Sequence, residues 1–177
     1  MYCLRLVREP LPVSCYGDYS LSNKNIIHKI RKSVVSDAVY IQELINGIAK
    51  TGQVLPRSLN NIYENLRDFF VYEKEGRIYG CSALHITWEN LAEIRSLVVH
   101  DSCRGRGIGR ELVDVCCKEA KEFGINKVFL LTEKTVFFGK FGFEPVDKSL
   151  LPHKIWSDCV QCIHFPNCQE TAMMKNI

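Results

Sequence analysis

Apolar residues recur along the chain at two spacings, one typical of helices and one of strands. From Ala38 to Ile48 and again from Ile108 to Phe123 they return every three or four positions, which predicts two long helices. Shorter helices are predicted over 58–66, capped by Ser58, and over 135–141. Compact or alternating apolar runs predict strands over 30–35, 69–73, 77–87, 91–99, 127–132, 143–146 and 171–174.

The order of these elements predicts one mixed sheet with helices packed on it. No helix separates the strands at 69–73, 77–87 and 91–99, so they should pair antiparallel. A helix joins 91–99 to 127–132, so these two should be parallel neighbours. The fold class expected is α/β (α+β), a mostly antiparallel mixed sheet flanked by helices. Ligands can bind where the carboxyl ends of parallel strands part.

Composition indicates a single ordinary globular domain. The chain has 177 residues, 46% of them hydrophobic and 24% charged, and a net charge of +3. We expect an N-terminal extension over 1–28, a core over 29–150 and a cysteine-containing tail over 151–177. The scattered basic residues give no case for nucleic acid, and no apolar run is long enough for a membrane span. The nine cysteines form no regular framework, which predicts free thiols in the cytoplasm.

A glycine-rich turn between the strand at 91–99 and the following helix is the strongest candidate site. Its glycines leave main-chain N–H groups open to a phosphate at a helix N-terminus, and its arginines add positive charge. The residues are Arg104, Gly105, Arg106, Gly107, Ile108, Gly109 and Arg110. No Lys-Ser/Thr pair follows the last glycine, and the glycine spacing is not that of a dinucleotide fingerprint. An ordinary turn with solvated arginines stays open as the alternative.

Two motifs together resemble the Gcn5-related N-acetyltransferase (GNAT) superfamily. Arg104 to Gly109 fits the R/Q-x-x-G-x-G/A acyl-CoA loop of that superfamily, preceded by the strand residues Leu97, Val98 and Val99. The run Phe-Phe-Gly-Lys-Phe-Gly-Phe at 137–143 is similar to its closing F-Y/F-x-x-x-G-F element. The resemblance covers about residues 30–146. It implies a GNAT-like fold with a central pair of diverging parallel strands and acetyl-CoA as cosubstrate.

Further segments resemble the acetyltransferase domain of N-acetylglutamate synthases, in particular the short forms without an amino-acid-kinase domain. They are Leu-Pro-Arg-Ser at 55–58, Gly-Cys-Ser-Ala-Leu at 80–84, Ala-Glu-Ile-Arg-Ser-Leu-Val-Val at 92–99 and Leu-Leu-Thr at 130–132. This resemblance implies transfer of acetyl from acetyl-CoA to the α-amine of L-glutamate, the first step of arginine biosynthesis. The alternatives are another amino acid, a polyamine or a protein amine as acceptor, or a non-catalytic acyl-CoA-binding regulator. The oligomeric state stays open, a homodimer included.

The chemistry of amide formation points to particular residues. Glu93 aligns with the glutamate of the synthases' E-I/M motif and is the expected general base, with a solvent-facing strand carboxylate as the alternative. The Val98 N–H is the expected donor to the carbonyl oxygen. Arg57 and Arg95 are expected to bind the two carboxylates of glutamate, because arginine forks match carboxylates in charge and shape. Each could instead be a surface arginine.

One position departs from the superfamily pattern. Many members carry a tyrosine four residues before the glycine of the closing Gly-Phe pair, where it protonates the leaving thiolate. Here that residue is Phe138. Thr135 or a water could donate instead, although a helix cap is the plainer role for Thr135.

The tail carries a Cys-x-x-Cys pair that could bind metal. Cys159, Cys162 and Cys168, with His153 and His164 nearby, could supply soft ligands to zinc. No second Cys-x-x-Cys pair exists, so a redox-sensitive pair and simple buried thiols compete with it. Thiols without metal are the favoured interpretation.

Overall fold

The structure, a computed structural model, describes residues 28–51, 54–151 and 169–177. The tail cysteines Cys159, Cys162 and Cys168 lie outside these ranges. Within the described ranges the α-helices are α1 (Ala38–Ala49), α2 (Leu59–Glu64), α3 (Ile108–Glu122) and α4 (Thr135–Gly139). The strands are β1 (His28–Lys32), β2 (Phe69–Lys74), β3 (Arg77–Trp88), β4 (Leu91–Val99), β5 (Lys127–Thr132), β6 (Glu144–Pro145) and β7 (Thr171–Asn176). Single 3₁₀ turns occupy 35–37, 66–68, 101–103 and 148–150.

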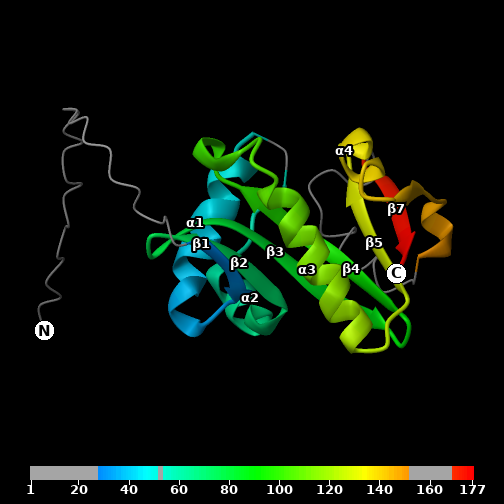
Figure 1. The fold of residues 1–177 in the computed structure, drawn as a ribbon, viewed down its shortest axis with the longest axis horizontal. Coiled ribbons are helices and arrows are strands. Elements are labelled where there is room, and N and C mark those ends of the chain that lie inside the picture. The colour runs from blue at the N-terminus through cyan, green and yellow to red at the C-terminus, as the bar shows by residue number, and fades with distance from the viewer. Residues whose placement is uncertain (1–27, 52–53, 152–168) are drawn as a thin grey trace, which may run out of the picture.

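The strands form one seven-stranded mixed sheet in the order β1-β2-β3-β4-β5-β7-β6 (Figure 1). Only β4 and β5 run parallel, and α3 connects them. Every other pair is antiparallel. The α/β (α+β) class and the mostly antiparallel sheet expected from the sequence are thereby confirmed. The strand at Thr171–Asn176 enters the sheet between β5 and β6, so the end of the chain pairs with its middle.

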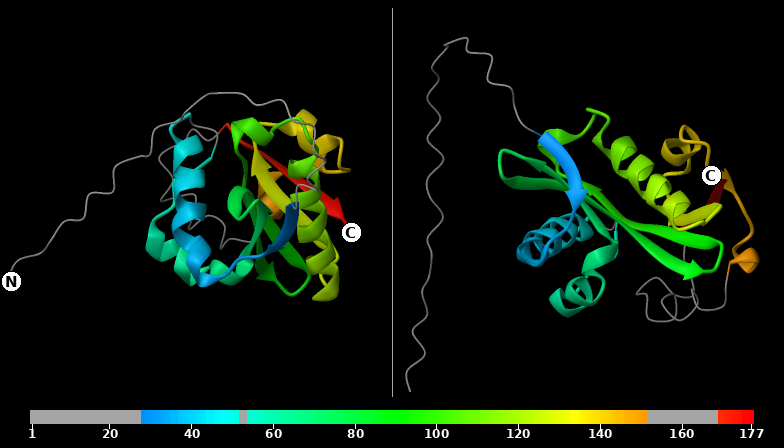
Figure 2. Two further views of the ribbon diagram at one scale, coloured as in Figure 1. Left: turned by 60° about the vertical axis from the view of Figure 1, so that its left-hand side comes forward. Right: turned by 60° about the horizontal axis from the view of Figure 1, so that its bottom comes forward.

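Helices cover both faces of the sheet (Figure 2). On one face, α3 and α4 pack on β3, β4, β5 and β7 through a cluster that includes Val113, Cys116, Leu130 and Phe138. On the other face, α1 and α2 pack on β2, β3 and β4 through a second cluster that includes Ile41, Ile45 and Ile62. Strands β3 and β4 are thus covered on both faces, which explains why their apolar side chains point to both sides of the sheet.

The parallel strands β4 and β5 pair only at their first residues. The paired positions run from Leu91 with Lys127 to Glu93 with Phe129, although β4 continues to Val99 and β5 to Thr132. Beyond Glu93 the two strands diverge, and β4 has an unpaired edge on that side. We call this divergence the splay. It is the feature of the sheet that exposes main-chain groups of β4 to a ligand.

A β-bulge interrupts β4 beside the splay. Ala83 pairs with Arg95 and Cys81 pairs with Val98, so β4 has one residue more than β3 in this stretch. Ser96 takes up the extra residue with a φ of 54°, in the left-handed region that non-glycine residues seldom occupy. Side chains before the bulge alternate in one register and those after it in the other.

Some element boundaries differ from the expectation. The first strand ends at Lys32 rather than at Val35, because Asp37 turns the chain there. Its carboxylate accepts hydrogen bonds from the Val34 N–H at 2.8 Å and from Arg31 at 2.6 Å, and it makes no cap to α1. The last predicted core strand, 143–146, reduces to Glu144–Pro145 because proline gives no N–H to a sheet. The cap at Ser58 is confirmed by its hydrogen bond from the Asn61 N–H at 3.1 Å.

Candidate functional site

The glycine-rich loop connects the end of β4 to the start of α3, as the sequence predicts. Gly105 has a φ of 75° and Gly107 a φ of 85°, so both use a conformation that other residues reach only with strain. Gly107 directly precedes the first helical residue, Ile108. The loop therefore turns sharply into α3 without a side chain over its main chain.

The loop presents unused hydrogen-bond donors to whatever lies at the helix N-terminus. Within the described ranges, the N–H groups of residues 105–109 donate to no other main-chain group. The helix behind them spans 15 residues, so the positive end of its dipole adds to them. Arg104 and Arg110 flank the loop with their side chains 46% and 66% exposed. Amides, dipole and arginines together fit the pyrophosphate of coenzyme A.

Gly109 brings α3 close to α4. A Cβ built on Gly109 would lie 3.2 Å from Cζ of Phe137 and 3.9 Å from a methyl group of Val99. The Arg110 guanidinium lies 5.8 Å from the centre of the Phe141 ring. The loop motif and the closing Phe-Gly motif, far apart in sequence, therefore meet at the N-terminus of α3. Both motifs could be recognised in the sequence, but their contact with each other was not predicted.

The register of β4 with β3 decides which main-chain N–H groups of β4 face the splay. The His100 N–H donates to the Tyr79 carbonyl of β3 at 2.7 Å. Because N–H groups alternate along a strand, Val98 in register with Cys81 also directs its N–H toward β3. Leu97 and Val99 then direct theirs toward the splay. The oxyanion role of the Val98 N–H stays a prediction, and this register offers Leu97 and Val99 as donors beside it.

Glu93 and Arg95 lie on the sheet face that α1 and α2 cover. Their cross-strand partners are His85 and Ala83, and Ala83 belongs to the cluster packed against those helices. Both residues are partly buried. Glu93 is also the last residue of β4 that pairs with β5, so its carboxylate sits where the splay begins. The sequence predicted the shared face from their spacing, and the structure agrees.

Arg57 reaches the same face from the start of α2. Its Nε donates to the hydroxyl of Ser96 at 3.1 Å, and its Nη1 donates to Asn61 at 2.9 Å. Its main-chain N–H donates to the Asn46 side chain of α1 at 2.9 Å. The arginine is thus fixed by two helices and directed at the bulge of β4.

Arg95 belongs to a polar network that the sequence did not predict. Its Nη2 donates to Asn65 at 3.1 Å and lies 3.8 Å from a carboxylate oxygen of Asp68. The same Asp68 oxygen lies 2.7 Å from Nδ1 of His85. Only 12% of the Arg95 side chain is exposed. The network fixes His85 beside its cross-strand partner Glu93. The one sequence signal for it was strand alternation, which places His85 on that face.

The closing motif places Phe138 in the core. Phe138 is 7% exposed, and its ring meets that of Phe143 edge to face at 5.9 Å. Thr135 is the first residue of α4 and makes no cap, since the cap position is Lys134. The Thr132 hydroxyl instead accepts from the Lys134 N–H at 2.9 Å. Thr132 is therefore a second hydroxyl near the end of β5, beside the predicted donor Thr135.

Four cysteines in the described ranges are free thiols: Cys81, Cys103, Cys116 and Cys117. Burial raises the pKa of Cys81 to about 12, and the pKa of Cys116 is also about 12. Both are therefore inert packing residues. Across the same ranges no three His, Cys, Asp or Glu side chains lie together as metal ligands. None of the helices described has the length and apolar character needed to cross a membrane.

Comparison with known proteins agrees with this geometry. Residues 43–143 match the acetyltransferase (GNAT) family model. An uncharacterized N-acetyltransferase of Chlorobaculum tepidum is 40% identical over 84% of this chain and 96% of its own. An amino-acid acetyltransferase of Mycobacterium tuberculosis is 32% identical over 73% of this chain and 75% of its own.

Solved structures show the same architecture. A Mycobacterium tuberculosis protein in complex with CoA and NLQ is 27% identical and superposes with a TM-score of 0.74, over 84% of this chain and 99% of its own. The N-acetylglutamate synthase of Neisseria gonorrhoeae, in complex with coenzyme A and N-acetyl-glutamate, shares the fold at 24% identity and a TM-score of 0.78. That match covers 86% of this chain and 36% of the synthase. The chain belongs to the GNAT family of acetyltransferases, which transfer acetyl from acetyl-CoA to an amine.

Proposed function

We propose that this acetyltransferase acts on the α-amine of an amino acid, and that the amino acid is L-glutamate. The observation that carries the proposal is the pair of arginines, Arg57 and Arg95, on the same sheet face as Glu93. They come from different elements, the start of α2 and the middle of β4. An acceptor with two carboxylates and one amine needs two cationic groups and one proton acceptor, and this face supplies all three.

The comparisons support the choice of an amino acid. The relatives named amino-acid acetyltransferase include that of Mycobacterium tuberculosis, at 32% identity. The Neisseria gonorrhoeae structure contains N-acetyl-glutamate, the product expected from a glutamate acceptor. A polyamine acceptor fits less well, because Arg57 and Arg95 would repel its ammonium groups.

The residues suggest how the reaction would proceed. The α-ammonium of the acceptor must lose a proton before its nitrogen can attack the thioester carbon, and Glu93 would accept that proton. As the nitrogen attacks, negative charge develops on the carbonyl oxygen. The main-chain N–H groups of Leu97 or Val99, which the strand register directs toward the splay, would stabilise it. The C–S bond then breaks, and the coenzyme A thiolate takes a proton from Thr135, Thr132 or water. Direct transfer needs no covalent enzyme intermediate.

The decisive experiment measures release of free thiol from acetyl-CoA with each of the twenty amino acids, spermidine and a lysine peptide. We expect L-glutamate to give the highest kcat/KM by at least tenfold. A higher value with another amino acid would replace glutamate within the same mechanism. Equal turnover of spermidine or the peptide would rule out an amino-acid acceptor. Binding of acetyl-CoA without any turnover would identify a regulator instead.

A further inference from the structure

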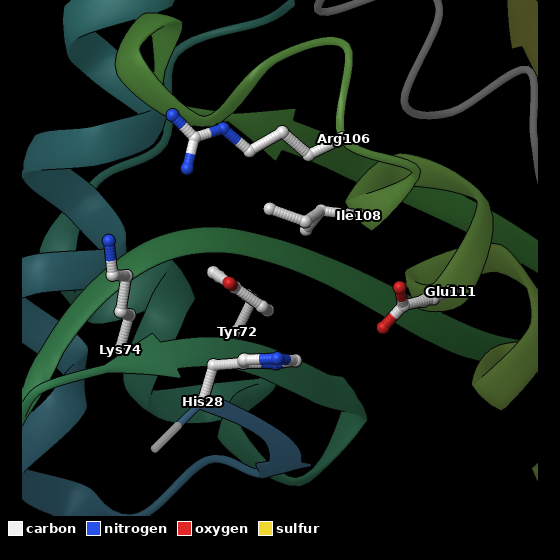
Figure 3. A pocket seen from close by; sticks show the side chains of 6 residues that line it. All are labelled: His28, Tyr72, Lys74, Arg106, Ile108 and Glu111. Carbon is white, nitrogen blue, oxygen red and sulfur yellow. The ribbon is translucent and has the colours of Figure 1, made fainter. Parts of the chain in front are cut away.

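A pocket lies beside the N-terminus of α3. It has a volume of about 330 Å³, within the range of small-molecule sites. Its walls come from the edge strand β1, from the neighbouring strand β2 and from the start of α3 (Figure 3). The lining residues are His28, Tyr72, Lys74, Arg106, Ile108 and Glu111. None of the acceptor-side residues Arg57, Glu93 and Arg95 belongs to it.

The floor of this pocket is the side chain of Tyr72. Tyr72 is 6% exposed, and Figure 3 shows its oxygen directed into the space between the other lining side chains. Within the described ranges this hydroxyl makes no hydrogen bond to protein. The ring is buried while the hydroxyl opens into the pocket, so the oxygen can donate to a molecule that enters it. Burial also raises the pKa of Tyr72, which keeps the hydroxyl protonated as a donor.

Charged side chains surround the Tyr72 hydroxyl without pairing. In Figure 3 the Lys74 ammonium and the Arg106 guanidinium extend on one side of it, and the Glu111 carboxylate lies on the other. Among the described residues none of these three side chains forms a hydrogen bond or an ion pair. The ring of His28 lies 5.9 Å from that of Tyr72 and covers the lower side. The pocket therefore offers cationic donors at one end and an acceptor at the other.

We propose that this pocket binds a small organic anion. Its phosphate or carboxylate would accept hydrogen bonds from Lys74, Arg106 and the Tyr72 hydroxyl. A hydroxyl or amino group at its other end would donate to Glu111. Two cations against one carboxylate give the pocket a net positive charge, which favours an anion over a cation or a neutral molecule.

Binding at this pocket would change the affinity for acetyl-CoA. Arg106 and Ile108 line the pocket and also belong to the glycine-rich loop. A ligand that holds Arg106 toward Lys74 therefore fixes one conformation of the loop, and the two affinities change by the same factor. This coupling rests on the assignment of the loop to acyl-CoA, whereas the binding itself does not.

Titration calorimetry on the full-length protein, saturated with coenzyme A, tests the proposal. The probes are glycerol 3-phosphate and L-malate, which carry an anionic group and a hydroxyl, and inorganic phosphate as the truncated probe. We expect one of the first two to bind more tightly than inorganic phosphate. Lys74→Gln should weaken that binding about tenfold and Tyr72→Phe about fivefold, the usual effects of removing such hydrogen bonds. Glu111→Gln should reduce the ratio by which the organic anion binds more tightly than inorganic phosphate, because Glu111 would accept from the hydroxyl of the organic anion.

The matched control is Lys118→Gln, which removes an exposed cation of the same helix α3 far from the pocket. It should leave the affinity unchanged. Circular dichroism and the melting temperature confirm that each variant is folded.

Tighter binding of glycerol 3-phosphate identifies a phosphate ligand, and tighter binding of malate identifies a carboxylate. No binding up to about 10 mM, or equal binding by wild type and Lys74→Gln, overturns the proposal. Binding that coenzyme A abolishes also overturns it, because the pocket would then belong to the coenzyme site. Since calorimetry needs no turnover, failure of glutamate acetylation leaves this result intact.

Discussion

Glu93 occupies the point where β4 and β5 part, next to the acceptor-side arginines. Replacing it by glutamine keeps the shape of the side chain and removes its ability to accept a proton. We expect Glu93→Gln to lower kcat by 10²- to 10⁴-fold at neutral pH, the usual contribution of a general base. Glu89→Gln, in the exposed turn between β3 and β4, is the matched control. A kcat within a factor of two of wild type would remove Glu93 from the mechanism.

The two arginine sites should separate in steady-state kinetics. Arg57→Lys keeps the charge but loses the hydrogen bonds to Ser96 and Asn61, so the KM for glutamate should rise about tenfold. Arg110→Gln acts at the loop, so the KM for acetyl-CoA should rise instead. Each variant is the control for the other. Equal changes in both KM values for Arg57→Lys would indicate that this arginine only supports the bulge.

Gly109 packs closely against Phe137, so a Cβ at this position requires the ring to shift. We expect Gly109→Ala to displace the Phe137 ring, raise the KM for acetyl-CoA several-fold and destabilise the fold by about 1 kcal/mol. Gly47→Ala is the control, because a Cβ on this α1 residue would meet nothing within 4 Å. It should stabilise the protein by about 0.5–1 kcal/mol through helix propensity alone. Denaturant unfolding and initial rates measure both effects. An unchanged KM in Gly109→Ala would show that the ring moves at no cost to the site.

At this scale the sequence predicts residues that lie in motifs and misses those held by tertiary contacts. The loop from Arg104 to Arg110 could be proposed from sequence because its glycine spacing follows from phosphate chemistry. Asp68 and Asn65 were missed, because their contacts to Arg95 cross 27 and 30 positions of the chain, a separation that no local pattern encodes.

Among the elements, β1 is tied to α1 mainly by an ion pair. Arg31 contacts Asp37 at 2.6 Å and Glu73 of β2 at 2.7 Å. We expect Asp37→Asn to destabilise the protein by about 2 kcal/mol, because it leaves the partly buried Arg31 with one carboxylate fewer and weakens the turn at Val34. Glu43→Gln, on the exposed side of α1, should change stability by less than about 0.5 kcal/mol. If Asp37→Asn lowered the free energy of unfolding by less than about 0.5 kcal/mol, the ion pair would not be required for stability.

The same pair makes stability depend on pH. Burial alone would raise the pKa of Asp37, but the hydrogen bonds from Arg31 and Val34 outweigh it, and the net pKa is lowered. The contribution of the carboxylate is therefore complete above its unfolded value of about 3.9 and is lost as pH falls through the lower folded value. Unfolding free energies between pH 6 and pH 3 should fall less steeply in Asp37→Asn than in wild type. Parallel curves would contradict this assignment.

Elements were predicted well where the pattern is long and less well at their ends. The 91–99 and 127–132 strands match the structure residue for residue, because turn residues bound each of them in the sequence. The first strand was placed too late because Val34 and Val35 look like strand residues in sequence. Both are exposed in the structure, where the Asp37 turn holds them.

For the whole molecule, the cysteines report on global unfolding. Cys81 and Cys116 lie in the clusters on opposite faces of the sheet, and each has a pKa of about 12. A thiol reagent at pH 8 should modify them only when the sheet separates from its helices, so their labelling rate should fall together as stability rises. Peptide mass mapping resolves each site. Faster labelling of one of the two would show that one face of the sheet opens independently.

The order of the elements in the sequence was enough to predict the architecture of the sheet, but not the arrangement of the site. An uninterrupted series of strands and one helical crossover are enough to place β2 to β5 in the sheet. The path of β7 back between β5 and β6, and the packing of α1 and α2 over Glu93, depend on contacts between distant segments. The network around Arg57, Glu93 and Arg95, the proposed acceptor side, is built from such contacts, so the sequence could propose these residues but could not predict their network.

The extra residue at Ser96 determines to which face of the sheet each later side chain of β4 points. Before it, odd-numbered side chains such as Glu93 and Arg95 face α1 and α2; after it, Val98 faces those helices and Leu97 and Val99 face α3. Removing one residue here would restore simple alternation and exchange the inward and outward faces of the rest of the strand. The acceptor groups and the coenzyme loop could then no longer serve the same reaction from one strand. A single-residue deletion at 96 should therefore abolish activity even in protein that still folds.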